Sequence, residues 1–344
     1  MGRFLFFGGF MVFIVLMLAM DLGVFHKKDH EIKMKEAALW TAFWVVMALG
    51  MALLLRLRAE WVHGITNMED LLAYVHAMGL DGLVAPDMAW GDALELYRRE
   101  VTNQYLAGYF LEESLSIDNI FVMMMIFVSF GVGKEYYHRV LFWGILGAIV
   151  LRFVFIFALG AVVERFSWVL ALFGVILIWS GVKMFRDKGD ERIDTENHPM
   201  VRFASRHFRV SHRMEGGKFF CVEDGKRCIT PLMLVLIVVE GSDIVFAVDS
   251  IPAVFSVTRD PFIVYFSNIF AIMGLRSLFF LLSGVADRFW LLKYGLGVLL
   301  CFIGVKMIGH EFFGLNISTL ASLGVILGIL TGSVVGSMVV KKRE

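Results

Sequence analysis

Nine apolar stretches, each about as long as a lipid bilayer is thick, divide this sequence of 344 residues. A helix that crosses the hydrocarbon core needs ~20 mostly apolar residues. The chain is 58% hydrophobic and only 19% charged, whereas a water-soluble domain is about 45–50% apolar. We therefore expect an all-α polytopic membrane protein with about nine transmembrane helices. The expected spans are residues 4–25, 37–57, 103–130, 139–163, 166–186, 229–257, 262–284, 289–309 and 317–340.

Lysine and arginine collect in segments that nine spans would place on one side of the membrane. These segments are the first short loop, residues 187–228 and the C-terminal KKRE. The segment 58–101 falls on the opposite side and is rich in Asp and Glu. Because cytoplasmic loops carry the excess of positive charge, we predict a multi-pass protein of the plasma (inner) membrane, with its N-terminus outside and its C-terminus inside.

The overall composition excludes several other classes of protein. Net charge is +0, with 32 basic and 32 acidic residues, so nothing indicates nucleic acid. The three cysteines, Cys221, Cys228 and Cys301, are odd in number and lack zinc-type spacing, so neither a disulfide framework nor a zinc site is expected. No phosphate-binding GxxxxGK[ST] motif occurs. We therefore expect neither an ATP-driven enzyme nor a prosthetic group.

Two parts of the chain resemble each other in sequence and order. EESLSIDNIF (112–121) aligns with EGSDIVFAVDSIP (240–252), and GVKM recurs at 181–184 and 304–307. Each unit holds three spans, and an odd number of crossings turns the second unit over, so we predict two inverted three-helix repeats with a substrate site near the midplane between them. The lysines of the GVKM motifs, Lys183 and Lys306, are expected to reach the two membrane surfaces. The predicted segments are 1–57 (two N-terminal helices), 58–101 (extracytoplasmic acidic segment), 102–186 (repeat 1), 187–228 (basic cytoplasmic loop), 229–310 (repeat 2) and 311–344 (C-terminal helix and basic tail).

Acidic side chains lie inside two spans that are otherwise apolar. The third span carries Glu112, Glu113 and Asp118, and the sixth carries Glu240, Asp243 and Asp249. Each costs ~2.5–3.5 kcal/mol near the bilayer centre, so a functional reason is expected. Two mid-span arginines, Arg152 and Arg276, compensate for only part of this negative charge, and Asp21 adds to it. The pattern indicates a site for a cation or for protons, although a purely structural network around the arginines stays an alternative.

The spacing within the sixth span bears on how these carboxylates meet. Glu240 and Asp243 are three residues apart and share a helix face. Asp249 would point away from them on a regular helix. Because proline removes a backbone hydrogen bond, we predict that Pro252 breaks this helix near 248–252 and turns Asp249 towards the site. A milder distortion is expected at 116–119 in the first repeat.

The donor atoms in the two acidic spans are all hard oxygens. They include the Asn119 amide and the Ser250 hydroxyl beside the carboxylates, and neither span contains His or Cys. Such a donor set suits Mg²⁺, Ca²⁺ or Mn²⁺ rather than Cu⁺ or Zn²⁺. Glu113 and Asp21 are interpreted as accessory or proton-carrying groups.

Three stretches of the sequence resemble the TerC family of integral membrane proteins, within the LysE-type transporter group. They are YLAGYFLEESLSIDNIFV (105–122), TPLMLVLIVVEGSDIVFAVDSIPAVF (230–255) and FSNIFAIMGLRSLFFLL (266–282). The resemblance implies manganese export and a metal site formed by the acidic motifs, which Asn268 of the SNxFA motif would join. The implied metal-binding residues are Glu112, Asp118, Asn119, Glu240, Asp243, Asp249, Ser250 and Asn268.

Together these observations predict a secondary-active exporter of a divalent cation. Mn²⁺ is the expected substrate, with Ca²⁺ left open by the donor chemistry, and H⁺ is the simplest exchanged ion. One repeat would rock against the other around a fixed site. A second hypothesis is a membrane interaction protein that helps to metalate or assemble exported partner proteins, with residues 58–101 as its contact surface. A passive channel is a third, less favoured because clustered carboxylates would hold a divalent ion too tightly.

Overall fold

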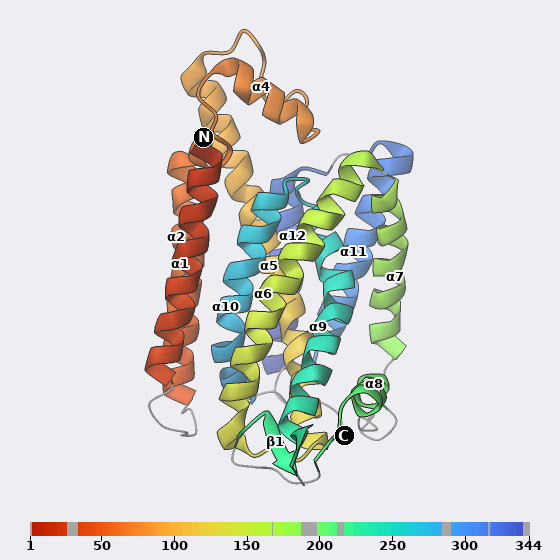
Figure 1. Ribbon diagram of the computed structural model, residues 1–344. Helices are drawn as coiled ribbons and strands as arrows, with labels where there is room; N and C mark the ends of the chain where they lie inside the picture. The colour runs from red at the N-terminus through yellow and green to blue at the C-terminus, as the bar shows by residue number, and fades with distance from the viewer. Residues whose placement is uncertain are drawn as a thin grey trace.

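The computed structural model describes residues 2–25, 34–166, 168–186, 198–211, 217–223, 225–283, 290–315 and 317–339, without the side chains of 2–5 and 21–25. Long helices run side by side and form one bundle, with a small helical cap at one end (Figure 1). The long helices are α1 (Gly2–Phe25), α2 (Met34–Arg58), α5 (Trp90–Ser129), α6 (Lys134–Arg165), α7 (Val169–Arg186), α9 (Pro231–Phe255), α10 (Pro261–Ser283), α11 (Leu292–Phe313) and α12 (Thr319–Val339). The short elements are α3 (Glu60–His63), α4 (Met68–Ala77), α8 (Pro199–His207), β1 (Phe220–Glu223) and β2 (Lys226–Ile229).

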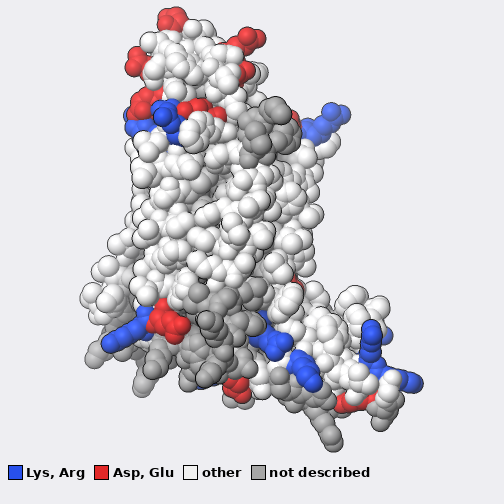
Figure 2. Space-filling model, turned by 60° about the vertical axis from the view of Figure 1, so that its left-hand side comes forward, with Lys and Arg blue, Asp and Glu red and all other residues white. Residues whose placement is uncertain are grey.

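The helical bundle is a polytopic membrane protein, as predicted. Seven of the described helices are long and apolar enough to cross a membrane. Of the other two long helices, α1 has Phe6–Met20 as the apolar stretch within its described residues. Helix α5 carries six acidic residues, of which Glu112, Glu113 and Asp118 lie in its apolar part. Figure 2 shows a broad uncharged band, with Asp and Glu mainly on the cap and Lys and Arg mainly at the opposite end. The count of nine spans and their orientation stay predictions.

The two distorted helices that the sequence predicts are not present. Helix α9 is continuous from Pro231 to Phe255 with Pro252 inside it, and α5 is continuous from Trp90 to Ser129. Pro252 lies in the last turn of α9, where the missing N–H group removes a single hydrogen bond close to the helix end. The prediction of a break at 248–252 is therefore wrong.

Helices α7 and α11 make the closest helix contact between the two predicted repeats. A methyl group added at Gly174 would lie 2.9 Å from the Gly304 carbonyl oxygen, and one at Gly181 would lie 2.6 Å from the Gly297 carbonyl oxygen. In the sequence repeat, Gly174 corresponds to Gly297 and Gly181 to Gly304. This crosswise pairing is the arrangement that two antiparallel helices related by a two-fold axis adopt, so it supports the predicted inversion.

A hairpin at the end opposite the cap leads directly into α9. Strands β1 and β2 pair antiparallel, and Cys221 is opposite Cys228. The two cysteines form a disulfide, which corrects the expectation of none. Counting cysteines could not show this pair, because it depends on the register of a two-stranded hairpin. Thr230 then caps α9 by accepting a hydrogen bond from the Met233 N–H.

The acidic segment 58–101 folds into the cap through a buried ion pair. His63 Nε2 in α3 lies 2.5 Å from Asp260 Oδ2, just before α10. His63 Nδ1 lies 2.5 Å from the Tyr97 hydroxyl, and the Tyr74 hydroxyl donates to Asp260 at 2.8 Å. Burial opposes the charged form of Asp260, but His63, Tyr74 and a backbone N–H together lower its pKa. This pair ties the cap to the start of α10.

We expect Asp260→Asn to lower the free energy of unfolding of the purified protein by ~3–5 kcal/mol, because it leaves buried His63 without its charge partner. A carboxylate whose folded-state pKa is lowered stabilises the fold above its unfolded value and loses that effect as pH falls. The difference in melting temperature between wild type and variant should therefore be largest near neutrality and shrink below pH ~4.

The measurement is circular dichroism melting in detergent between pH 3 and pH 8. Asp81→Asn is the matched control, since Asp81 pairs with His76 at 2.9 Å on the exposed surface and such pairs contribute little. Equal melting temperatures for Asp260→Asn and Asp81→Asn at every pH would show that the buried pair does not hold the cap.

Candidate cation-binding site

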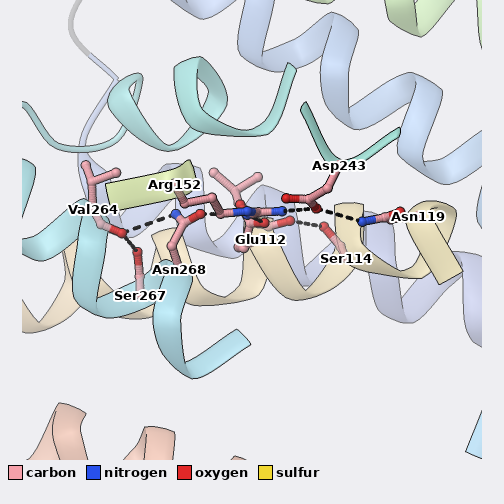
Figure 3. Close-up of polar contacts among 9 residues, drawn as sticks. Glu112, Ser114, Asn119, Arg152, Asp243, Val264, Ser267 and Asn268 are labelled. Carbon is pink, nitrogen blue, oxygen red and sulfur yellow. Dashed lines mark hydrogen bonds and ion pairs between the residues drawn. The ribbon is translucent and has the colours of Figure 1, made fainter. Parts of the chain in front are cut away.

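Arg152 of α6 lies at the centre of a buried polar cluster (Figure 3). Its side chain is 3% exposed and forms an ion pair with Glu112 of α5. A second ion pair joins Arg152 Nη2 to Asp243 Oδ1 of α9 at 3.2 Å. A charged group can stay buried only where it is paired and hydrogen bonded. Arg152 therefore connects an acidic residue from each of the two motifs.

Two amide side chains complete this cluster. Asn119 Nδ2 donates to Asp243 Oδ1 at 3.0 Å, and Arg152 Nη1 donates to Asn268 Oδ1 at 2.7 Å. Asn268 is held in turn, because its Nδ2 donates to the Val264 carbonyl at 3.1 Å. The Arg152 cluster is Glu112, Asn119, Arg152, Asp243 and Asn268, which come from helices α5, α6, α9 and α10. With two carboxylates and one guanidinium, it is formally negative.

Several oxygen atoms at and beside the Arg152 cluster are buried without a hydrogen-bond partner in the described part of the chain. An orphaned buried polar atom costs ~1–3 kcal/mol and calls for an explanation, such as a bound ion or water. Carboxylate, amide and hydroxyl oxygens are the donors that hard divalent cations take. The atoms are Glu112 Oε2, Ser116 Oγ, Asn119 Oδ1, Asp243 Oδ2 and Ser250 Oγ.

A cavity of about 500 Å³ adjoins the Arg152 cluster and reaches Glu112 and Arg152. Asp118 of α5, together with Asp249 and Ser250 of α9, also lines it. The Ser180 hydroxyl of α7 donates to Asp249 Oδ1 at 3.1 Å. Oxygen donors therefore continue from the cluster into a space large enough for a hydrated ion.

Glu240 of α9 borders a second, small space beside Arg152. It lines this space together with Arg152 and Asp243, as expected for two carboxylates three residues apart on one helix face. A Cβ atom at Gly147 of α6 would lie 2.0 Å from Glu240 Oε1. A side chain at this position would therefore displace the Glu240 carboxylate from its place against α6.

The structure groups most of the predicted metal-binding residues but does not form them into one ligand shell. Among the described residues, no three Asp, Glu, His or Cys side chains lie close enough to hold a metal ion. The physical reason is Arg152, whose guanidinium lies between Glu112 and Asp243. Asp118, Asp249 and Ser250 instead line the cavity.

Three further predicted residues lie elsewhere. Glu113 is hydrogen bonded to Tyr109, one turn earlier in α5. Arg276 is buried in α10, with 3% exposure, and lines neither space beside Arg152. Asp21 belongs to α1, outside the residues whose side chains are described.

Helix α7 supplies two residues that the sequence analysis did not place in the site. Ser180 and Lys183 both line the cavity. Lys183, which was expected to reach a membrane surface, is exposed in the last turn of α7. The Lys183 ammonium nitrogen lies 5.7 Å from the centre of the Trp179 ring, which also borders this space. The signal available was the recurrence of lysine at one position of both GVKM motifs.

Comparisons with known proteins identify the family of this chain. The model of the integral membrane protein TerC family matches residues 97–344, which include most of α5, all of α6 to α12 and the whole Arg152 cluster. The chain belongs to the TerC family. No solved structure matches it.

Several curated relatives align with nearly the whole chain, cap included. A Salmonella typhi protein provisionally named membrane-bound redox modulator Alx is 42% identical over 96% of this chain and 92% of its own length. The Alx protein of Escherichia coli K12 is 41% identical over 96% and 92%. The membrane protein STKORF319 of Myxococcus xanthus, which is uncharacterised, is 41% identical over 96% and 91%.

We expect Arg152→Gln to destabilise the TerC fold by ~3–5 kcal/mol, since it leaves two buried carboxylates without a cation. Adding Glu112→Gln and Asp243→Asn to the same chain should recover part of that loss. Melting temperatures in detergent with a metal chelator present measure both effects. Arg165→Gln, at the exposed end of the same helix, is the control, and an Arg152→Gln protein as stable as this control would contradict a central role for Arg152.

Proposed function

We propose that the protein is a secondary-active transporter that exports Mn²⁺ from the cytoplasm in exchange for H⁺. The observation that carries this proposal is the set of buried oxygen atoms without partners at and beside a formally negative cluster. A structural network would be expected to pair these atoms, because each orphan is costly. A network with unpaired oxygen atoms suits a cation that binds and is released.

The donor chemistry favours a hard divalent cation. Neither of the two spaces beside Arg152 is lined by His or Cys among the described residues. Carboxylate, amide and hydroxyl oxygens accommodate Mn²⁺ and Ca²⁺, whereas Cu⁺ prefers sulfur. Between Mn²⁺ and Ca²⁺, the resemblance to the TerC family favours Mn²⁺.

Arg152 provides the balancing charge while the site is empty. Its guanidinium neutralises Glu112 and Asp243 when no dication is present. A dication that entered from the cavity would repel the guanidinium strongly, because charges interact over short distances with little screening inside a protein. Arg152 would then move off the carboxylates, which would become metal ligands with Asn119 and Asn268.

Proton exchange follows from the same carboxylates. A carboxylate can bind either a metal ion or a proton, so release of the metal to the outside frees it to accept a proton from that side. Asp118 and Asp249 line the cavity, and Glu240 lines the second space beside Arg152. These residues are therefore the proposed proton carriers between the cluster and the two sides of the membrane.

The first test measures metal in whole cells under manganese excess by elemental analysis. Cells that express the wild type should hold less manganese than cells without it, while Asp243→Asn or Asp249→Asn should lose this effect. Loss of a metal ligand or its immediate support typically weakens binding ~10–100-fold. Asp81→Asn, on the exposed cap surface, is the control expressed at the same level.

Unchanged manganese with stable wild-type protein would contradict the proposal. It would favour instead a membrane interaction protein that assists metalation or assembly of exported partners. A specific change in calcium would keep the transport mechanism and correct the substrate.

The second test separates an exchanger from a channel in liposomes. We expect Mn²⁺ flux to accelerate when the opposite compartment is acidified and to be accompanied by proton movement in the reverse direction, read with a pH-sensitive dye inside the vesicles. The Asp249→Asn protein should lose both signals together. An Mn²⁺ flux whose rate is independent of the proton gradient would rule out proton coupling.

A further inference from the structure

Two bonded cysteines lie at the end of the protein that the charge distribution places in the cytoplasm. Cys221 of β1 is opposite Cys228 of β2, their Cα atoms are 5.1 Å apart and their sulfurs are bonded. The two residues are 5% and 3% exposed. Disulfides do not normally persist in the cytosol, where thiols keep cysteines reduced. A disulfide in that compartment is usually redox-active rather than structural.

A basic groove opens over this disulfide. Its volume is about 750 Å³, within the ~300–1,000 Å³ of typical small-ligand sites, and both cysteines line it. Its charged lining consists of Arg209, Lys218 and Arg227, and no carboxylate borders it among the described residues. Cationic surroundings favour the thiolate form of cysteine, which is the reactive form. The groove is therefore suited to a small anion that reacts with sulfur.

We propose that Cys221 and Cys228 form a thiol–disulfide switch that is reduced by a small anionic thiol bound in this groove. The thiolate of one thiol molecule attacks one cysteine sulfur, which breaks the bond between the two cysteines and forms a mixed disulfide. A second thiol molecule then attacks that mixed disulfide. The protein gains two electrons and two protons, and the two thiol molecules leave joined as their own disulfide. Oxidation by that small-molecule disulfide runs the same steps backwards.

The hairpin is linked to the helices that form the cation site. Thr230, the first residue after β2, donates its hydroxyl to the Lys218 carbonyl at 2.7 Å and caps α9. Phe219 packs beneath the Arg139 guanidinium of α6 at 5.6 Å and edge-on against Trp143 of that helix, with ring centres 6.5 Å apart. Helices α6 and α9 carry Arg152 and Asp243. Opening the disulfide would loosen the connection between these two helices at their cytoplasmic ends.

The test compares three thiols on the purified protein in a Cys301→Ser background, so that only the hairpin pair reports. Glutathione carries a net charge of about −1 at neutral pH and cysteamine about +1, while 2-mercaptoethanol is neutral. At equal thiolate concentration and low salt, we expect glutathione to reduce the pair ~10-fold faster than cysteamine, with the difference lost as salt screens the groove. Reduction is followed by mass spectrometry after alkylation.

Matched variants test the groove itself. Arg209→Gln and Arg227→Gln should each remove part of the preference for glutathione, whereas Arg186→Gln, a basic residue at the end of α7 outside the groove lining, should leave it unchanged. Equal rates for all three thiols, or a preference that survives loss of both groove arginines, would overturn the proposed binding site.

Trapping the thiols in growing cells tests the switch. Alkylation should find the pair mainly reduced under normal growth and oxidised after a pulse of the thiol oxidant diamide, with recovery over the following minutes. A pair that is oxidised throughout is a structural disulfide, and a pair that never oxidises is two ordinary cysteines; either result overturns the proposal. The readout is the redox state alone, so the result does not depend on whether the protein exports manganese.

Discussion

The ion pairs of one buried arginine determine how the centre of this protein is assembled. Arg152 on α6 holds Glu112 of α5 and Asp243 of α9 and hydrogen bonds to Asn268 of α10. Removing one partner from such a buried pair costs far more than the pair itself contributes, because the remaining charge is left in a medium of low dielectric constant. The four helices must therefore meet at this point, whatever their apolar surfaces would otherwise allow.

The polar groups of the Arg152 cluster are only partly paired. Its charges do not balance, and oxygen atoms of Glu112, Asn119 and Asp243 lack partners within the described residues. A partly satisfied polar network is less stable than either a satisfied one or an apolar core. Natural proteins break such local rules mainly at functional sites. An incomplete network next to a cavity that holds Asp118 and Asp249 is the physical basis for proposing a cation site here.

The sequence predicted the elements better than the site. The expected spans overlap the long helices because bilayer thickness sets the length of a span, although α5 begins at Trp90, within the predicted segment 58–101. The three-residue spacing placed Glu240 beside Asp243. The predicted break at 248–252 was wrong, because the rule for proline assumes a helix that continues well beyond it, whereas α9 ends at Phe255. The single metal shell was not found because spacing along one helix cannot show that Arg152 of another lies between the carboxylates. Ser180 was missed for the same reason.

The glycine contacts also restrict how such a site could open. Rocking one predicted repeat against the other would separate α7 from α11, yet Gly174, Gly181, Gly297 and Gly304 hold these helices backbone to backbone. Backbones packed this closely leave no room for side chains that adapt to sliding. It is easier for α7 and α11 to move together against the four helices around Arg152. Such a motion would carry Ser180 away from Asp249, and the cavity would open along α7 while the four helices around Arg152 stayed packed together.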